Sequence, residues 1–84
     1  MKPVKIYSKN YCPYCSRAKS LLDRKGVNYE EINLEGKKDE MAALIKETGM
    51  RTVPQIYIGD YFVGGFTELK ALETNGELDS KLND

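Results

Sequence analysis

Histidine is absent from this 84-residue chain, and cysteine occurs only at Cys12 and Cys15. A structural zinc site needs about four Cys or His ligands, so these residues supply half of one at most. The missing histidine also removes the side chain that most often serves as a general base near neutral pH. We therefore expect no metal site, and chemistry at the cysteines has to proceed without an imidazole.

Excess charge and long apolar runs are missing as well. Lys plus Arg and Asp plus Glu number 13 each, so the chain has no basic field that would hold nucleic acid. No run approaches the roughly 18 apolar residues of a membrane span, and residues 1–5 lack the apolar core of a signal peptide. We expect a cytoplasmic protein with no nucleic-acid or membrane partner. In a reducing cytosol a close cysteine pair is expected to be catalytic rather than a permanent crosslink.

The two cysteines occur in the sequence Cys12-Pro13-Tyr14-Cys15, with Cys-x-x-Cys spacing. Residues 3–8 include β-branched and aromatic side chains, and the apolar residues after the cysteines recur at helical spacing. Cys12 is therefore predicted as the N-cap of a helix that follows a strand. Pro13 is predicted as the first helical residue, where its missing N–H is no loss. A redox pair is favoured over the two alternatives, which are inert core cysteines and half of a zinc site.

The N-cap position is expected to make the Cys12 thiol reactive, because the unpaired N–H groups of a first helical turn favour an anion. Cysteines in such positions have pKa values of roughly 3.5 to 7.5, against about 8.5 for a free thiol. A helix terminus supplies about 0.3 to 2 kcal/mol, whereas a pKa near 6 needs about 3.4 kcal/mol. We expect the remainder from the Cys15 S–H, donated to Cys12, and from the ammonium group of Lys9. The pKa of Cys15 should stay near its ordinary value.

The pattern of apolar and turn-forming residues predicts an α/β fold with the element order β-α-β-α-β-β-α. A helix connects the first two strands, so they should be parallel and joined by a right-handed crossover. The length allows one small domain, 1–84, with a four-stranded mixed sheet flanked by helices. The predicted strands are 3–8, 27–34, 53–58 and 61–63. The predicted helices are 13–25, 39–48 and one that is N-capped by Thr67 and ends before Gly76, with a short helical turn at 78–82.

Three motifs carry a resemblance to a known family, and they occur in the same order as in that family. They are Cys12-Pro13-Tyr14-Cys15, Thr52-Val53-Pro54 and Gly64-Gly65-Phe66-Thr67-Glu68. The chain resembles the dithiol glutaredoxins of the thioredoxin-like superfamily over nearly its whole length. It departs from them at Glu68, where the family usually has Asp, and at Phe66, where it often has Cys or Ser.

The resemblance implies a thioredoxin-like fold and a set of residues that bind glutathione. Pro54 would be cis and would turn the backbone of Val53 toward the cysteines, where it can pair with a peptide. Thr67 would bind the α-carboxylate of the γ-glutamyl group, Glu68 would face its α-amino group, and Tyr14 would pack against the bound peptide. The implied glutathione-binding residues are Lys9, Tyr14, Thr52, Val53, Pro54, Gly65, Thr67 and Glu68.

Each of these roles has a structural alternative. Pro54 could simply begin an edge strand, Thr67 could be an ordinary N-cap, and Lys9 could be a solvated lysine. The glycine carboxylate of glutathione could be received by Arg51 or by Lys38, and the sequence does not decide between them. The helix residues Arg17 and Lys19 are interpreted as surface positions.

The implied activity is glutathione-dependent thiol-disulfide oxidoreduction, with Cys12 as nucleophile and Cys15 as resolving thiol. The expected substrates are glutathionylated and disulfide-bonded proteins, and a monomer is expected. Glutathione would be the reducing co-substrate, kept reduced by a flavin-dependent reductase, with no tightly bound cofactor.

Two other functions stay open. A redoxin served directly by thioredoxin reductase would need no glutathione groove, so Thr67 and Glu68 disfavour it. A module that holds an iron-sulfur cluster between two protomers through Cys12 and glutathione would be crowded by Pro13. Visible absorbance of the purified protein would distinguish the cluster-binding module from the enzyme.

Overall fold

Four strands and four helices follow one another along residues 1–83, which are the residues that the computed structural model describes. They are β1 (Val4–Ser8), α1 (Pro13–Arg24), β2 (Tyr29–Asn33), α2 (Lys38–Thr48), β3 (Gln55–Ile58), β4 (Tyr61–Gly64), α3 (Phe66–Thr74) and α4 (Leu78–Asn83). The strands form one sheet in the order β2-β1-β3-β4. β1 pairs parallel with β2 and antiparallel with β3, and β3 pairs antiparallel with β4. The predicted four-stranded mixed sheet and its thioredoxin-like order are confirmed.

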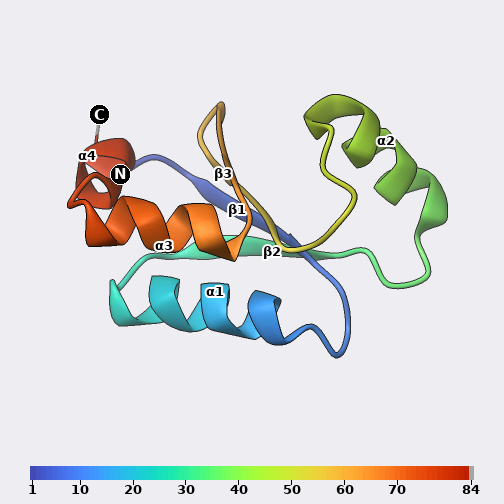
Figure 1. Cartoon of the computed structure of the whole chain (residues 1–84), viewed down its shortest axis with the longest axis horizontal. Coiled ribbons are helices and arrows are strands. Elements are labelled where there is room, and N and C mark those ends of the chain that lie inside the picture. Colours follow the sequence, from blue (N-terminus) through green and yellow to red (C-terminus); the bar gives the residue numbers. More distant parts are fainter. Residues whose placement is uncertain (84) are drawn as a thin grey trace.

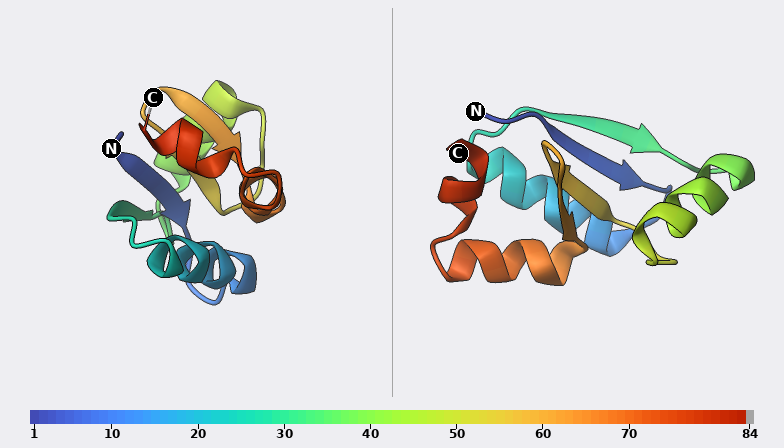
Figure 2. Two further views of the ribbon diagram at one scale, coloured as in Figure 1. Left: turned by 90° about the vertical axis from the view of Figure 1, so that its left-hand side faces the viewer. Right: turned by 90° about the horizontal axis from the view of Figure 1, so that it is seen from above.

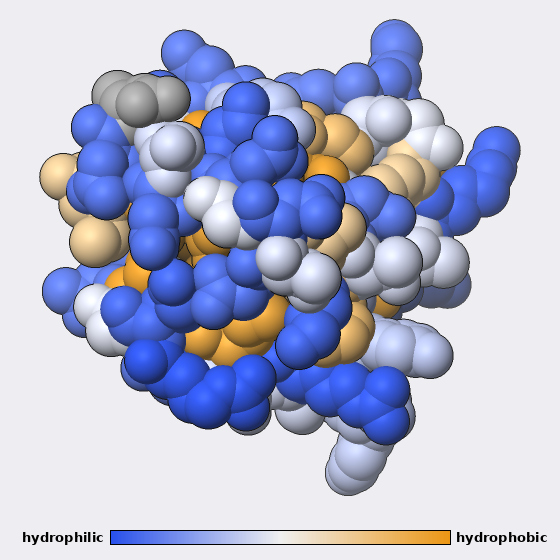
Figure 3. Space-filling model, turned by 60° about the vertical axis from the view of Figure 1, so that its left-hand side comes forward, coloured by the Kyte–Doolittle hydropathy of each residue, from blue (hydrophilic) through white to orange (hydrophobic). Residues whose placement is uncertain are grey.

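The two faces of the sheet are covered by different helices, with α1 and α3 on one face and α2 on the other (Figures 1 and 2). Alternation along β1 explains this arrangement, because successive side chains of a strand point to opposite faces. Val4 and Ile6 pack in the larger core with residues of α1, α3 and α4, whereas Tyr7 packs with the smaller cluster around Leu44 of α2. Hydrophilic residues predominate on the side of the molecule shown in Figure 3, where hydrophobic residues are visible mainly in narrow gaps.

Several predicted boundaries were wrong by one or two residues. The predicted strand 27–34 is shorter because Val27 takes part in the turn that caps the end of α1. The Val27 N–H donates to the Leu22 carbonyl at 3.0 Å, and Gly26 has a φ of 71°. The strand predicted over 53–58 begins at Gln55, since the preceding residues form a loop. The predicted helical turn at 78–82 is present as α4, and the Lys2 N–H donates to the Leu82 carbonyl at 2.7 Å.

A polar contact joins β1, β2 and α1 next to the larger core. The buried Ser8 hydroxyl donates to Glu31 Oε2 at 2.6 Å, and Lys19 Nζ lies 3.0 Å from the same oxygen. The Ser8 hydrogen bond, followed by Lys19, holds the pKa of Glu31 below its usual range. Lys19 was interpreted as helix surface, but it is a partner of this carboxylate.

We expect Glu31→Gln to lower the melting temperature in a pH-dependent way. Because folding lowers the pKa of Glu31, its ionised form contributes stability above the unfolded-state pKa of about 4.3, and this is lost as the pH falls through the folded-state pKa. The difference from wild type should be full near pH 6 to 7 and should shrink toward about pH 3. Thermal unfolding across this range measures it, with the exposed neighbour Glu30→Gln as the control. A difference that does not change with pH would contradict the expectation.

Candidate active site

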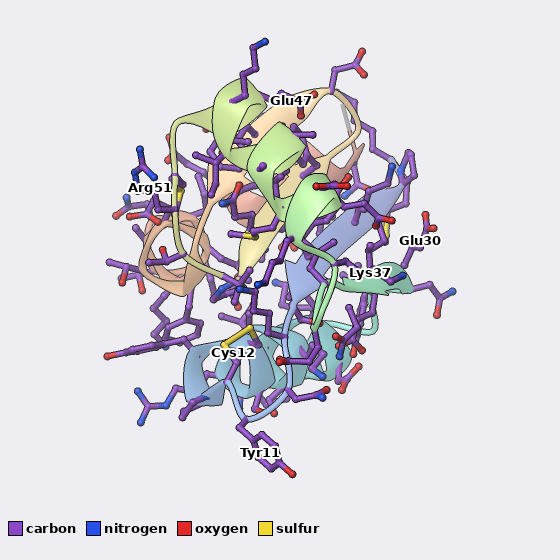
Figure 4. The ribbon with its side chains drawn as sticks, turned by 90° about the vertical axis from the view of Figure 1, so that its right-hand side faces the viewer. Tyr11, Cys12, Glu30, Lys37, Glu47 and Arg51 are labelled. Atoms are coloured by element: carbon purple, nitrogen blue, oxygen red, sulfur yellow. A yellow bond between two sulfur atoms is a disulfide. The ribbon has the colours of Figure 1, made fainter. Side chains whose placement is uncertain are left out.

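Cys12 lies at the N-terminal end of α1, as the sequence predicted (Figure 4). It is the N-cap, its φ and ψ are −114° and 100°, and its sulfur accepts a hydrogen bond from the Cys15 N–H at 3.2 Å. Pro13 is the first helical residue. Cys12 and Cys15 form a disulfide with a Cα–Cα distance of 5.2 Å. Cys15 is only 2% exposed, whereas Cys12 is partly exposed, so an incoming thiol has better access to the Cys12 sulfur.

Tyr11 makes the turn that brings the chain from β1 to this helix start. Its φ is 55°, a left-handed conformation that is uncommon for a residue other than glycine. Its side chain is fully exposed and points away from the molecule (Figure 4). Such backbone conformations cost about 1 to 3 kcal/mol and cluster at functional sites. This turn could not be predicted from the sequence, because tyrosine is not a residue that favours it.

A loop distant in sequence lies against the cysteine pair. The Val53–Pro54 peptide bond is cis, as expected from the resemblance. The Val53 carbonyl oxygen lies 3.8 Å from Cys12 Sγ. Pro54 is buried and directly precedes β3, which pairs with β1 in the centre of the sheet. The main chain of Val53 is therefore held beside the exposed sulfur.

The start of α3 forms the next part of the site, and here one prediction was wrong. Thr67 is the second helical residue, and the N-cap is Gly65. Glycine has no side chain to cap the helix, but Glu68 Oε1 accepts a hydrogen bond from the Gly65 N–H at 2.7 Å. The first intrahelical hydrogen bond runs from the Leu69 N–H to the Gly65 carbonyl at 3.1 Å. The N–H groups of residues 66–68 therefore point past the helix start, as at other helix N-termini.

A groove of about 320 Å³ connects these segments. Its volume is at the lower end of the range of about 300 to 1,000 Å³ for small-molecule sites. Every residue predicted to bind glutathione lines it except Lys9, and two further residues, Met50 and Phe66, complete its wall. The lining residues are Tyr14, Met50, Thr52, Val53, Pro54, Gly65, Phe66, Thr67 and Glu68. Val53 lines the groove, and its carbonyl oxygen also lies near Cys12 Sγ, so the groove opens next to the Cys12 sulfur.

Lys9 lines a different hollow, of about 370 Å³, that shares no lining residue with the groove. Lys37 and Lys38 line the same hollow. Arg51 is exposed, and in the view of Figure 4 Arg51 and Lys37 lie on opposite sides of Cys12. Lys38 and Arg51 are the two candidates for binding the glycine carboxylate of glutathione. Lys38 lines the same hollow as Lys9, whereas Arg51 directly precedes the groove-lining Thr52 in the sequence.

An aromatic stack borders the groove near the cysteines. The rings of Tyr14 and Phe66 are stacked, with centroids 6.2 Å apart and planes 29° from parallel. Arg17 Cζ lies 5.1 Å from the centre of the Tyr14 ring, so this residue is more than helix surface. Tyr14 remains 55% exposed, which leaves part of its ring for a bound molecule.

Known proteins of one family are similar to this chain in sequence. The glutaredoxin family model matches residues 4–63. A glutaredoxin from Pseudomonas aeruginosa is 52% identical over 83 residues, which cover 99% of both chains. Glutaredoxin 3 from Escherichia coli is 45% identical over 82 residues, which cover 98% of this chain and 99% of that protein.

Solved structures agree with these sequence matches. The crystal structure of the buckwheat glutaredoxin–glutathione complex has a TM-score of 0.89 and 40% identity, covering 96% of this chain and 76% of that one. The solution structure of glutaredoxin from Brucella melitensis has a TM-score of 0.87 and 44% identity, covering 100% of this chain and 94% of that one.

A cysteine pair at a helix start, beside a cis-proline loop in a thioredoxin-like fold, defines a thiol-disulfide oxidoreductase. The matches are more specific, because they cover nearly the whole chain at high identity. The chain belongs to the glutaredoxin family, and its Cys12–Cys15 pair is of the dithiol type.

The two glycines that precede α3, Gly64 and the groove-lining Gly65, should respond differently to a methyl group. At Gly64 the φ is 112°, and an added Cβ would lie 2.9 Å from Glu68 Oε1 and 3.0 Å from its Cγ. At Gly65 an added Cβ meets the Pro54 carbonyl oxygen and Glu68 Oε1 at 3.4 Å, which are ordinary contacts. We expect Gly64→Ala to lower the free energy of unfolding by about 1 to 3 kcal/mol, and Gly65→Ala by less than about 1. Urea unfolding measures both, and equal losses would contradict the expectation.

Proposed function

We propose that the chain reduces protein–glutathione mixed disulfides and protein disulfides, with glutathione as the reducing co-substrate. The observation that supports this most directly is the groove beside Cys12, lined by the three segments that resemble the glutathione site of the family. A structural relative that was solved as a glutathione complex supports the same ligand. In this proposal Cys12 is the nucleophile and Cys15 is the resolving thiol.

Glutathione would lie along the groove with its cysteine sulfur at Cys12. Its cysteinyl backbone would pair with the main chain of Val53, whose carbonyl oxygen is 3.8 Å from Cys12 Sγ. Its α-carboxylate would meet the Thr67 N–H and hydroxyl at the start of α3, where a helix favours an anion. Glu68 uses one carboxylate oxygen to accept the Gly65 N–H, and its second oxygen would face the α-amino group.

The other predicted residues, together with Phe66, would surround this ligand. Tyr14 and Phe66 would pack against its apolar surface, and Thr52, Pro54 and Gly65 would shape the groove. Lys9 does not line the groove, so we assign it to the electrostatic field near Cys12 rather than to direct contact with glutathione. The glycine carboxylate would be received by Arg51 or by Lys38.

The reaction with a glutathionylated protein needs only Cys12. Its thiolate attacks the glutathione sulfur of the mixed disulfide, and the protein leaves as a thiolate. A second glutathione thiolate then attacks the sulfur of the bound glutathione, which forms glutathione disulfide and regenerates the Cys12 thiolate. The helix start would provide the activation, because a lowered pKa makes Cys12 both ionised and a good leaving group.

Reduction of a protein disulfide needs both cysteines. Attack by Cys12 on one protein sulfur releases the other as a thiolate and leaves Cys12 bonded to the protein. Cys15 then attacks the Cys12 sulfur, releases the protein, and forms the disulfide that the structure contains. One glutathione opens this disulfide at the more exposed Cys12, and a second removes the first as glutathione disulfide.

The proposal extends to the state of the protein in the cell. We propose a single-domain monomer that acts in the cytoplasm on glutathionylated and disulfide-bonded proteins. Within residues 1–83, none of the helices has the length and apolar character that crossing a bilayer requires.

For the glutathione site, we expect the double variant Thr67→Val and Glu68→Gln to raise the KM for a glutathione mixed disulfide about thirtyfold, because the two lost hydrogen bonds are worth roughly 1 kcal/mol each. Glu68→Gln keeps an oxygen for the Gly65 N–H, so α3 should retain its start. Steady-state kinetics on a glutathionylated peptide measures the effect, and Lys70→Gln on the exposed part of α3 is the control. Unchanged kinetics in the folded variant would favour reduction by thioredoxin reductase.

The roles of the two cysteines can be separated by single substitutions. Cys15→Ser should retain most deglutathionylation activity, because free glutathione resolves the Cys12 intermediate. It should lose most protein-disulfide reduction, since the neighbouring thiol, with its high effective concentration, is gone. Cys12→Ser should lose both activities. Loss of deglutathionylation in a folded Cys15→Ser protein would contradict the one-cysteine branch.

A further inference from the structure

Gln55 is a fully buried polar residue at the start of β3, and each polar atom of its side chain has a partner. Its Oε1 accepts a hydrogen bond from the Thr48 hydroxyl at 2.8 Å. Its Nε2 donates to the carbonyls of Met50 and Thr52 at 2.8 and 2.9 Å. A buried amide with every partner in place fixes the positions of the groups it contacts. Gln55 therefore ties two carbonyls of one loop to the sheet.

The end of α2 belongs to the same network, in which the single proton of the Thr48 hydroxyl faces both Gln55 Oε1 at 2.8 Å and the Leu44 carbonyl at 3.0 Å. The Met50 N–H donates to Thr48 Oγ1 at 3.1 Å, so the same threonine contacts both the loop and Gln55. Met50, Thr52 and the next two residues form one wall of the groove. The Gln55 side chain thus fixes this wall through hydrogen bonds, although it does not line the groove itself.

The chemistry of this contact is specific for an amide. Two carbonyl oxygens can only accept, and the threonine hydroxyl can donate, so the site needs two N–H donors and one acceptor on the same side chain. Glutamine supplies both. An apolar residue would remove the donors of both loop carbonyls, and a carboxylate would place an oxygen against them.

We propose that Gln55 is a positioning residue for the substrate, and that it sets the loop so that the main chain of Val53 stays beside the Cys12 sulfur. The supporting distance is the 3.8 Å between the Val53 carbonyl oxygen and Cys12 Sγ. The inference rests on the proposed function, because it assumes that the Val53 main chain pairs with glutathione. Gln55 acts through the loop and leaves the reactivity of the thiol itself unchanged.

The first test compares substrate recognition with thiol reactivity in Gln55→Leu. We expect the KM for a glutathionylated peptide to rise about tenfold, with kcat changed by less than about threefold, since two loop hydrogen bonds are lost. The rate at which iodoacetamide alkylates reduced Cys12 should stay within about twofold of wild type, because this small reagent needs no groove. An unchanged KM would overturn the proposal. Equal decreases in kcat and in the alkylation rate of a folded variant would overturn it as well.

The second test uses Gln55→Glu, in which protonation should restore the contact. Burial and the two facing carbonyl oxygens raise the pKa of the new carboxyl above about 4.3, and buried glutamates reach about 8 to 9. Protonated, it can donate to one loop carbonyl; ionised, it repels both. The KM ratio of variant to wild type should therefore be clearly smaller near pH 5.5, where one of the two loop hydrogen bonds is restored, and rise toward the Gln55→Leu value near pH 8.5. A ratio that does not change with pH would overturn the proposal.

The matched control is Ser8→Ala, which removes a buried hydrogen bond to Glu31 elsewhere in the sheet. It should lower stability without a change in KM, and a rise equal to that of Gln55→Leu would show that lost stability alone explains the effect. A wild-type protein without glutathione-dependent activity would overturn the proposed function and this inference with it. An active wild type with an unaffected Gln55→Leu would overturn this inference alone.

Discussion

The hydrogen bond from the Cys15 N–H to the Cys12 sulfur decides where the reacting atom lies. Because this bond caps α1, the sulfur is fixed at the end of the helix, and the disulfide adds a second constraint between the same residues. The cap also gives the two sulfurs different surroundings, since Cys15 lies one turn into the helix and is buried. A substrate thiol therefore reaches the nucleophilic Cys12 more easily than the resolving Cys15 because of where the two residues lie in the helix.

The two walls of the groove are held in the same manner, by a side chain that bonds to main chain nearby in sequence. Gln55 donates to the carbonyls of Met50 and Thr52, and Glu68 accepts the N–H of Gly65. Each contact satisfies main-chain groups that the loop or helix start would otherwise leave unpaired. Both leave the groove-facing main chain available for a ligand. In the proposed function, this main chain pairs with the backbone of glutathione.

The sequence predicted the elements and the cysteine position because those depend on local patterns. The β-branched and aromatic residues of β1, Pro13 after Cys12 and the glycines after helices each indicate one structure. The start of α3 was misplaced by two residues, since Thr67 has the chemistry of an N-cap, whereas the N-cap is Gly65, whose N–H donates to Glu68. The separation of Lys9 from the groove could not be predicted, because it depends on how distant loops pack.

Glu68 illustrates how one departure from the family pattern can be compatible with function. Aspartate is usual at this position, whereas the longer glutamate reaches back one turn and accepts the Gly65 N–H at 2.7 Å. Glutamate at the third helical position is also the residue of the capping box, although glycine cannot complete that motif. A carboxylate has two oxygens, so capping by one leaves the other at the edge of the groove. The residue can therefore stabilise the helix start and still present a negative charge to an ammonium group.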